Sequence, residues 1–133
     1  MTFTTKKSFK DLVAESNAVV QHVNIEEAQV LLSQSHTQFV DLRDIRELYR
    51  TGVIPGAFSC PRGMLEFWID PESPYYKEVF GSEKLFVFYC DNGWRSALAA
   101  KAALDMGLPE VRHLEGGLDA WMQSGCALSP VKW

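Results

Sequence analysis

The segment LFVFYCDNGWRS, residues 85–96, decides the fold. Its first five residues, Leu85 to Tyr89, are all apolar and show no alternation, which is typical of a strand buried on both faces of a parallel sheet. Cys90 to Trp94 then form a tight loop, and an alanine-rich helix is predicted from Ser96 to Met106. Gly107 ends that helix, since glycine commonly follows a helix C-terminus. We therefore expect a strand, a short loop and a helix at the centre of an α/β sheet.

Strand and helix patterns alternate on both sides of this segment. Asn24 and Glu27 have the spacing of a capping box, and the helix they open is predicted to end near Ser33. The other expected helices are Asp44–Arg50, ended by Gly52, then Met64–Trp68 and Leu118–Ser124. The other expected strands are Val20–Val23, Phe39–Leu42 and Val111–Leu114, with a short extended piece at Ile54–Ala57. This alternation predicts an α/β fold in which helices cover both faces of a parallel sheet.

Length and composition fit one globular domain. The chain has 133 residues, and 47% of them are hydrophobic, which allows a sizeable core. The net charge of −4 gives no electrostatic footprint for nucleic acid, and no apolar run approaches the ~20 residues of a membrane span. Lys6 and Lys7 have no apolar segment behind them, so we do not expect a secretory signal. The three widely spaced cysteines match neither a disulfide framework nor a zinc site, and they predict that the protein is located in the reducing cytoplasm.

The N-terminal part of the chain is interpreted as an appendage. Ser8 is expected to cap a short helix that runs to about Ser16 and covers a sheet edge or docks a partner. We therefore divide the chain into an N-terminal helical extension, residues 1–19, and a domain formed by residues 20–133. The sequence does not indicate an oligomeric state.

Cys90 is the candidate nucleophile. It follows the most hydrophobic strand and precedes a helix N-terminus, which is where open α/β sheets form their sites. The short loop from Asp91 to Trp94 can turn its backbone N–H groups inward as an anion-binding nest, and the helix dipole adds a positive potential. Arg95 adds a permanent positive charge. These features favour a reactive thiolate at Cys90 over a buried, inert thiol.

Three motifs, in order along the chain, resemble those of the rhodanese-like sulfurtransferases. The family's active-site loop, Cys-x-x-Gly-x-Arg-Ser, is matched by Cys90-Asp91-Asn92-Gly93-Trp94-Arg95-Ser96. An upstream signature is matched by Asp41-Leu42-Arg43, Glu47 and the segment GVIPGA at residues 52–57, where Val53 replaces a histidine that the family often has. A C-terminal signature is matched by Leu114-Glu115-Gly116-Gly117 and Trp121. The resemblance covers about residues 20–126 and implies a three-layer α/β/α fold around a central, mostly parallel five-stranded sheet.

What the resemblance implies is a cysteine that cycles between thiol and persulfide. A small-molecule donor such as thiosulfate, or a protein persulfide, delivers a sulfane sulfur to the catalytic Cys90, and a thiol acceptor then removes it. No metal or organic cofactor takes part, and no nucleic-acid or membrane partner is implied. The residues expected to bind substrate are Asp91, Asn92, Gly93, Trp94, Arg95, Ser96 and Arg43, and those expected to support the site are Asp41 and Glu47.

Several of these residues have more than one interpretation. Asp41 and Arg43 either brace the loop, with Arg43 as a second anion contact, or form a solvated ion pair. Asp91 repels an anionic donor if its carboxylate points inward and has little effect if it points to solvent. Trp94 is expected at the mouth of the pocket, partly exposed, with its ring near the reactive sulfur. His113 is expected to be packed rather than catalytic, and Glu47 is expected to pair with an arginine.

Two other functions compete with sulfur transfer. Cysteine phosphatases of a similar fold use the same kinds of residue, but their loop between cysteine and arginine is longer than the four residues that separate Cys90 from Arg95. The smaller loop fits a sulfur atom better than a tetrahedral phosphate. Non-catalytic rhodanese-like binding modules typically lack the cysteine, which is present here. Cys60 and Cys126 have no comparable surroundings, so neither is expected to react.

Overall fold

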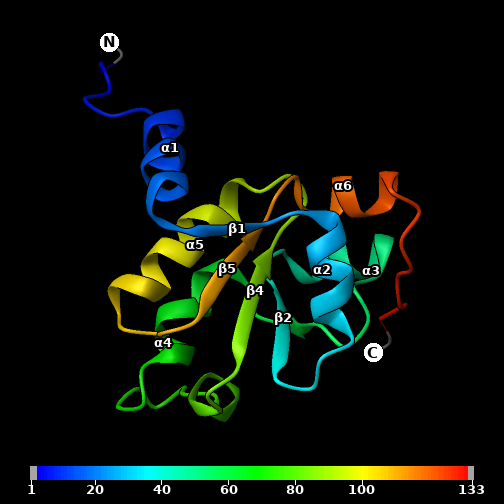
Figure 1. Cartoon of the computed structure of the whole chain (residues 1–133). Coiled ribbons are helices and arrows are strands. Elements are labelled where there is room, and N and C mark those ends of the chain that lie inside the picture. Colours follow the sequence, from blue (N-terminus) through cyan, green and yellow to red (C-terminus); the bar gives the residue numbers. More distant parts are fainter. Residues whose placement is uncertain (1–2, 132–133) are drawn as a thin grey trace.

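The structure is a computed structural model that describes residues 3–131. Its five strands form one parallel sheet with β4 at the centre (Figure 1). The strands are β1 Gln21–Val23, β2 Thr37–Asp41, β3 Phe58–Ser59, β4 Leu85–Tyr89 and β5 Val111–Leu114. Their order across the sheet is β1-β5-β4-β2-β3, and each neighbouring pair is parallel. The predicted α/β class and parallel sheet are therefore confirmed, because strands joined by helical crossovers return in the same direction.

Helices cover both faces of this sheet (Figure 1). They are α1 Phe9–Val19, α2 Ile25–Leu32, α3 Ile45–Thr51, α4 Leu65–Ile69, α5 Trp94–Asp105 and α6 Gly117–Gln123, with short 3₁₀ turns at Arg62–Met64 and Glu78–Gly81. The side chains of β4 alternate between two cores: Phe86 and Phe88 pack on the side of α4 and α5, and Val87 and Tyr89 pack on the side of α2 and α6. Burial on both faces is what the unbroken apolar run predicted.

The helix that follows the reactive loop begins two residues earlier than predicted, at Trp94 instead of Ser96. Gly93 has φ 106°, in the left-handed region, and this turns the chain from the loop directly into α5. The predicted capping box of Asn24 and Glu27 is confirmed at the start of α2. Loop and helix are therefore continuous at the carboxyl end of β4.

The N-terminal helix, α1, lies against α5, and its Asn17 carbonyl lies 3.2 Å from His22 Nε2 on the edge strand β1. Its Phe9 ring contacts the Trp94 ring at the start of α5, with centroids 4.9 Å apart. The helix extends to Val19, beyond the predicted end at Ser16. The outer ends of the two expected segments, residues 1–2 and 132–133, lie outside the described residues, and the division of the chain into extension and domain stays a prediction. Within residues 3–131, no helix is both long and apolar enough to cross a membrane.

Candidate active site

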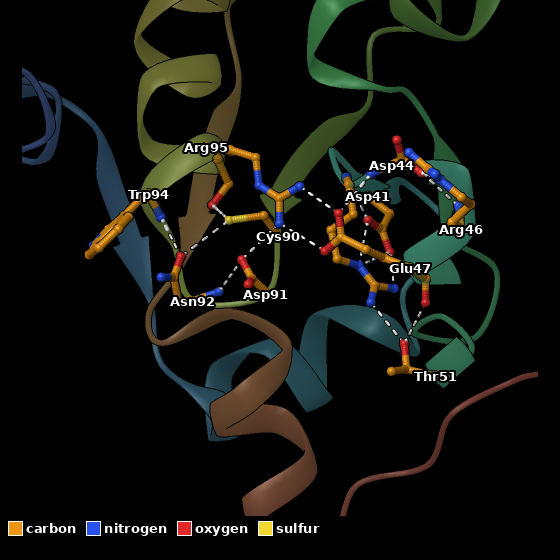
Figure 2. Close-up of polar contacts among 12 residues, drawn as sticks. Asp41, Asp44, Arg46, Glu47, Thr51, Cys90, Asp91, Asn92, Trp94 and Arg95 are labelled. Atoms are coloured by element: carbon orange, nitrogen blue, oxygen red, sulfur yellow. Dashed lines mark hydrogen bonds and ion pairs between the residues drawn. The ribbon is translucent and has the colours of Figure 1, made fainter. Parts of the chain in front are cut away.

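Cys90 follows β4 directly, lies just before α5, and has no exposed surface (Figure 2). The Gly93 N–H donates a hydrogen bond to the Cys90 Sγ at 3.1 Å. The Ser96 hydroxyl lies 3.5 Å from the same sulfur, and Asn92 Oδ1 lies 4.0 Å from it. A backbone N–H that points at sulfur stabilises the thiolate more than the thiol. The loop therefore places a donor on the one atom that would carry negative charge.

The first turn of α5 leaves two backbone donors open. A helix cannot satisfy its first N–H groups internally. The Trp94 N–H donates to Asn92 Oδ1 at 3.1 Å, and the Asn92 N–H donates to Asp91 Oδ1 at 2.8 Å. No acceptor among the described residues meets the backbone N–H of Arg95 or Ser96. The predicted nest is thus partly capped by its own side chains, and two backbone donors in the first turn of α5 have no partner among the described residues.

Two backbone groups of α6 hold the loop in place. The Leu118 N–H donates to the Cys90 carbonyl at 2.8 Å, and the Asp119 N–H donates to the Asp91 carbonyl at 2.9 Å. This close approach requires Gly117, whose φ is 59°: a Cβ there would lie 2.6 Å from the Cys90 carbonyl oxygen and 2.7 Å from that of Asp91. The second glycine of the Gly-Gly motif therefore supports the reactive loop.

Gly117→Ala is expected to destabilise the protein more than Gly107→Ala. Both glycines have positive φ, which costs a non-glycine residue ~1–3 kcal/mol. An alanine Cβ at position 107 would meet nothing within 4 Å, whereas at position 117 it would collide with the loop backbone. Urea unfolding of the two variants measures the difference. Equal losses in the free energy of unfolding for the two variants would show that the contact between α6 and the loop does not stabilise the protein.

Arg95 is paired with two carboxylates, which corrects the expectation that its charge serves the sulfur (Figure 2). Its guanidinium donates to both Glu47 oxygens, at 2.7 and 2.9 Å, and to Asp91 Oδ1 at 2.9 Å. The hydrogen bond to Glu47 is the main reason that the pKa of Arg95 is raised, and the same bond lowers the pKa of Glu47. The guanidinium charge is therefore neutralised, and Arg95 ties α3 to the loop.

The same contacts settle where Asp91 points. Its carboxylate faces Arg95 and the Asn92 N–H, and its side chain is 45% exposed. Partial burial acts to raise the pKa of Asp91, but the hydrogen bonds from Arg95 and the Asn92 N–H outweigh burial and lower it. Asp91 is therefore a carboxylate whose charge is balanced by Arg95, not one directed at an incoming anion.

Arg43 is buried and its guanidinium is occupied by neighbouring protein groups, contrary to the expected substrate contact. Its side chain is 2% exposed and forms an ion pair with the fully buried Asp41 at 2.8 Å. The remaining guanidinium donors reach Thr51 Oγ1 and the Gly52 carbonyl, each at 2.8 Å. The pair is therefore neither a second anion contact nor a solvated pair. It joins the end of β2 to the end of α3. Burial acts to lower the pKa of Arg43, but the hydrogen bond and charge of Asp41, with smaller contributions from other groups, outweigh burial and raise it.

Trp94 is half exposed, as expected, but its ring points away from Cys90 (Figure 2). The indole packs on Phe9 of α1. The expected position near the reactive sulfur is wrong because Trp94 is the first residue of α5, where its side chain projects toward the neighbouring helix.

Sequence reasoning missed a hydrogen-bonded histidine. His113 is buried on β5, as expected for a packed residue, but its Nδ1 lies 3.0 Å from the Ser96 hydroxyl, which in turn contacts the Cys90 sulfur. Burial lowers the pKa of His113 to about 4, so the ring is neutral at physiological pH. Register explains this contact: β5 neighbours β4, and His113 pairs with Phe88, two residues before Cys90. The sequence alone carries no signal for that pairing. Within residues 3–131, no group of three or more histidine, cysteine or acidic side chains could hold a metal ion.

The comparison with known proteins agrees with this arrangement. Residues 24–124 match the rhodanese-like domain family. Because this match covers most of the chain, the chain belongs to the rhodanese-like domain family. The thiosulfate:glutathione sulfurtransferase of Homo sapiens is 28% identical over 107 residues, which are 76% of this chain and 92% of that protein.

Solved structures extend the likeness. A protein of unknown function from Rhodopseudomonas palustris, described as a possible tyrosine phosphatase, is 49% identical, with a TM-score of 0.94 over 97% of this chain and 99% of its own. A human single-domain sulfurtransferase is 27% identical, with a TM-score of 0.65 over 78% of this chain and 96% of its own. The first likeness takes in the N-terminal helix, which precedes the family match.

Proposed function

We propose that the protein is a sulfurtransferase that carries a sulfane sulfur on Cys90 from thiosulfate or a protein persulfide to a thiol acceptor. The observation that carries this proposal is the Gly93 N–H on the Cys90 sulfur, 3.1 Å away, beside the two open donors of Arg95 and Ser96. Family membership and the likeness to human sulfurtransferase support it. The loop provides donors for one extra sulfur atom and requires no other group.

The proposed reaction has two displacements at sulfur. The Cys90 thiolate attacks the sulfane sulfur of thiosulfate, a bond forms between that sulfur and Sγ, and sulfite leaves with the electron pair of the broken sulfur–sulfur bond. The resulting persulfide anion accepts hydrogen bonds from the open N–H groups of the first turn of α5. A thiol acceptor or cyanide then attacks the outer sulfur, and Cys90 leaves as the thiolate.

Ser96 and His113 are assigned to hold the charge on the sulfur. With Nδ1 protonated, neutral His113 donates to the Ser96 hydroxyl, which is then oriented to donate to the Cys90 thiolate. Ser96 contacts the reacting atom directly, whereas His113 acts through Ser96 and is a positioning residue. The His113 ring cannot serve as a permanent proton acceptor, because burial lowers its pKa to about 4.

Ser96→Ala is expected to slow persulfide formation about tenfold, which corresponds to ~1.4 kcal/mol and to the loss of one hydrogen bond to a charged group. His113→Phe keeps a ring in the core but removes Nδ1, so it should slow the reaction by a smaller factor. His113→Asn should restore part of the rate, since its amide can donate from the same position. Rapid-quench mass spectrometry with thiosulfate gives the three rates. A wild-type rate for Ser96→Ala would contradict the assignment.

The phosphatase alternative has one observation in its favour, the description of the Rhodopseudomonas palustris protein. A phosphatase needs its arginine to bind the phosphoryl group. Here Arg95 is held by Glu47 and Asp91, and only four residues separate it from Cys90. These contacts support sulfur transfer over phosphoryl transfer.

Intact-protein mass spectrometry tests the proposed function. Thiosulfate should add the mass of one sulfur atom to the protein, and cyanide should remove it with release of thiocyanate. Hydrolysis of an aryl phosphate is measured alongside. Faster hydrolysis than thiocyanate formation would favour the phosphatase, and no reaction of either kind would favour a non-catalytic binding module.

A further inference from the structure

A pocket of about 380 Å³ lies beside the reactive loop. Its lining includes the loop residues Asn92 and Trp94 together with Asn17 and His22. Asn17 and His22 precede residue 24, where the family match begins. Residues that precede the family match, Asn17 from the N-terminal extension and His22 from β1, therefore form part of this pocket.

The described residues that line this pocket include one carboxylate, Glu115, and neither lysine nor arginine. Glu115 is 57% exposed, and one of its oxygens lies 3.5 Å from His22 Nδ1. Trp94 offers a half-exposed indole, whose face attracts cations. Asn17 lines the pocket from α1, and its side-chain oxygen is buried with no hydrogen-bond partner among the described residues. A carboxylate, an aromatic face and an unsatisfied acceptor together select a ligand with several N–H donors and a positive charge.

One residue, Asn92, lies between the pocket and the reactive sulfur. Asn92 lines the pocket, and its Oδ1 lies 4.0 Å from the Cys90 Sγ. Cys90 has no exposed surface, so a neighbouring side chain must move before a substrate reaches it. Asn92 is exposed, and its side-chain oxygen is held by one N–H, that of Trp94. Rotation of the exposed Asn92 side chain would therefore open a path from the pocket to the sulfur.

We propose that this pocket binds the sulfur acceptor and that the acceptor is a small primary aminothiol. Its ammonium group lies between Glu115 and Trp94, where the Asn17 amide can turn to meet it, and its sulfur reaches the persulfide past Asn92. The acceptor thiol loses its proton to the persulfide's outer sulfur as the new sulfur–sulfur bond forms, and Cys90 leaves as the thiolate. This assignment rests on the proposed function, because it needs a persulfide on Cys90.

The first test compares 2-aminoethanethiol with 2-mercaptoethanol as acceptors for the thiosulfate-loaded protein. Glu115→Gln should raise the KM for 2-aminoethanethiol about fivefold, as expected for loss of a partly exposed ion pair, and leave that for 2-mercaptoethanol unchanged. Comparing each variant with wild type for the same thiol cancels the intrinsic reactivity of that thiol. Glu110→Gln is the matched control, since Glu110 is exposed and precedes β5 whereas Glu115 follows it, and it should change neither KM. Equal changes for both thiols, or none, would overturn the proposal.

Two further arms sharpen the result. Asn17→Leu should raise the KM for 2-aminoethanethiol without changing that for 2-mercaptoethanol, and Glu115→Lys should reverse the preference in favour of mercaptoacetate.

The reduced protein separates this proposal from the proposed function. Its Cys90 thiolate can displace one half of a symmetrical disulfide, forming a mixed disulfide and releasing one thiolate, with no sulfane sulfur involved. Glu115→Gln should slow the reaction with the disulfide of 2-aminoethanethiol about fivefold and leave that of 2-mercaptoethanol unchanged. Failure of thiosulfate to load Cys90 would contradict the proposed function. Equal slowing of the reactions with both disulfides would contradict the assignment of the pocket to an aminothiol.

Discussion

Cys90→Ser is expected to abolish both sulfur loading and thiocyanate formation. The serine oxygen would sit under the same Gly93 N–H, but its alkoxide is inaccessible at neutral pH and cannot form a persulfide. The backbone of the loop is held by α6 through the Cys90 and Asp91 carbonyls, so the variant should fold normally. Intact mass after thiosulfate treatment measures loading, and urea unfolding checks the fold.

The other two cysteines provide matched controls. Cys60 is buried, and burial raises its pKa to about 12, so its thiol stays protonated. Cys126 is partly buried, and its sulfur accepts a hydrogen bond from Gln29 at 3.1 Å, on the opposite face of the sheet from α5. Cys60→Ser and Cys126→Ser should therefore keep most of the sulfur transfer. A Cys90→Ser protein that still gains and donates a sulfur atom would remove the basis of the proposed mechanism.

Most of the fold was predictable because it depends on patterns within single elements. The run from Leu85 to Tyr89 is apolar throughout, and β4 has these bounds and is buried on both faces. Val111–Leu114 was likewise predicted with its observed bounds. Helix ends were less accurate where a glycine decided them, as at Gly93, whose left-handed conformation starts α5 early. The position of α1 against α5 was missed because it depends on contacts between segments far apart in the sequence.

The residue types of the candidate site were predictable from the sequence, but the partners of their hydrogen bonds and ion pairs were not. Sequence placed Cys90, a glycine turn and Arg95 together, since they lie within one short loop. It did not show that Glu47, from another helix, would take the Arg95 charge, or that His113 would reach Ser96 from a neighbouring strand. These pairings depend on sheet order and register, which a single sequence leaves open. The same holds for Arg43, for which the sequence predicts a substrate contact, whereas the structure buries it in an ion pair with Asp41.

Arg43→Met is expected to lower the free energy of unfolding by ~3–5 kcal/mol, as for loss of one partner of a buried ion pair. The substitution leaves the Asp41 carboxylate fully buried without its cation, and it removes the hydrogen bonds that Arg43 makes to Thr51 and Gly52 at the end of α3. That end of α3 is fixed by Arg43, and Glu47 in its first turn is fixed by Arg95. The loss should therefore appear as a lower urea midpoint and a loosened α3.

Arg46→Met is the matched control for this prediction. Arg46 lies three residues further along the chain, also pairs with an aspartate, and is 87% exposed, so its removal should change stability by no more than ~1 kcal/mol. The folded fraction of Arg43→Met, assayed at low temperature, should keep the wild-type KM for thiosulfate, because the native Arg43 side chain is only 2% exposed and is held by Asp41. Comparable urea midpoints for the two variants, together with a raised KM for thiosulfate in Arg43→Met alone, would instead make Arg43 an anion contact that a movement of α3 exposes.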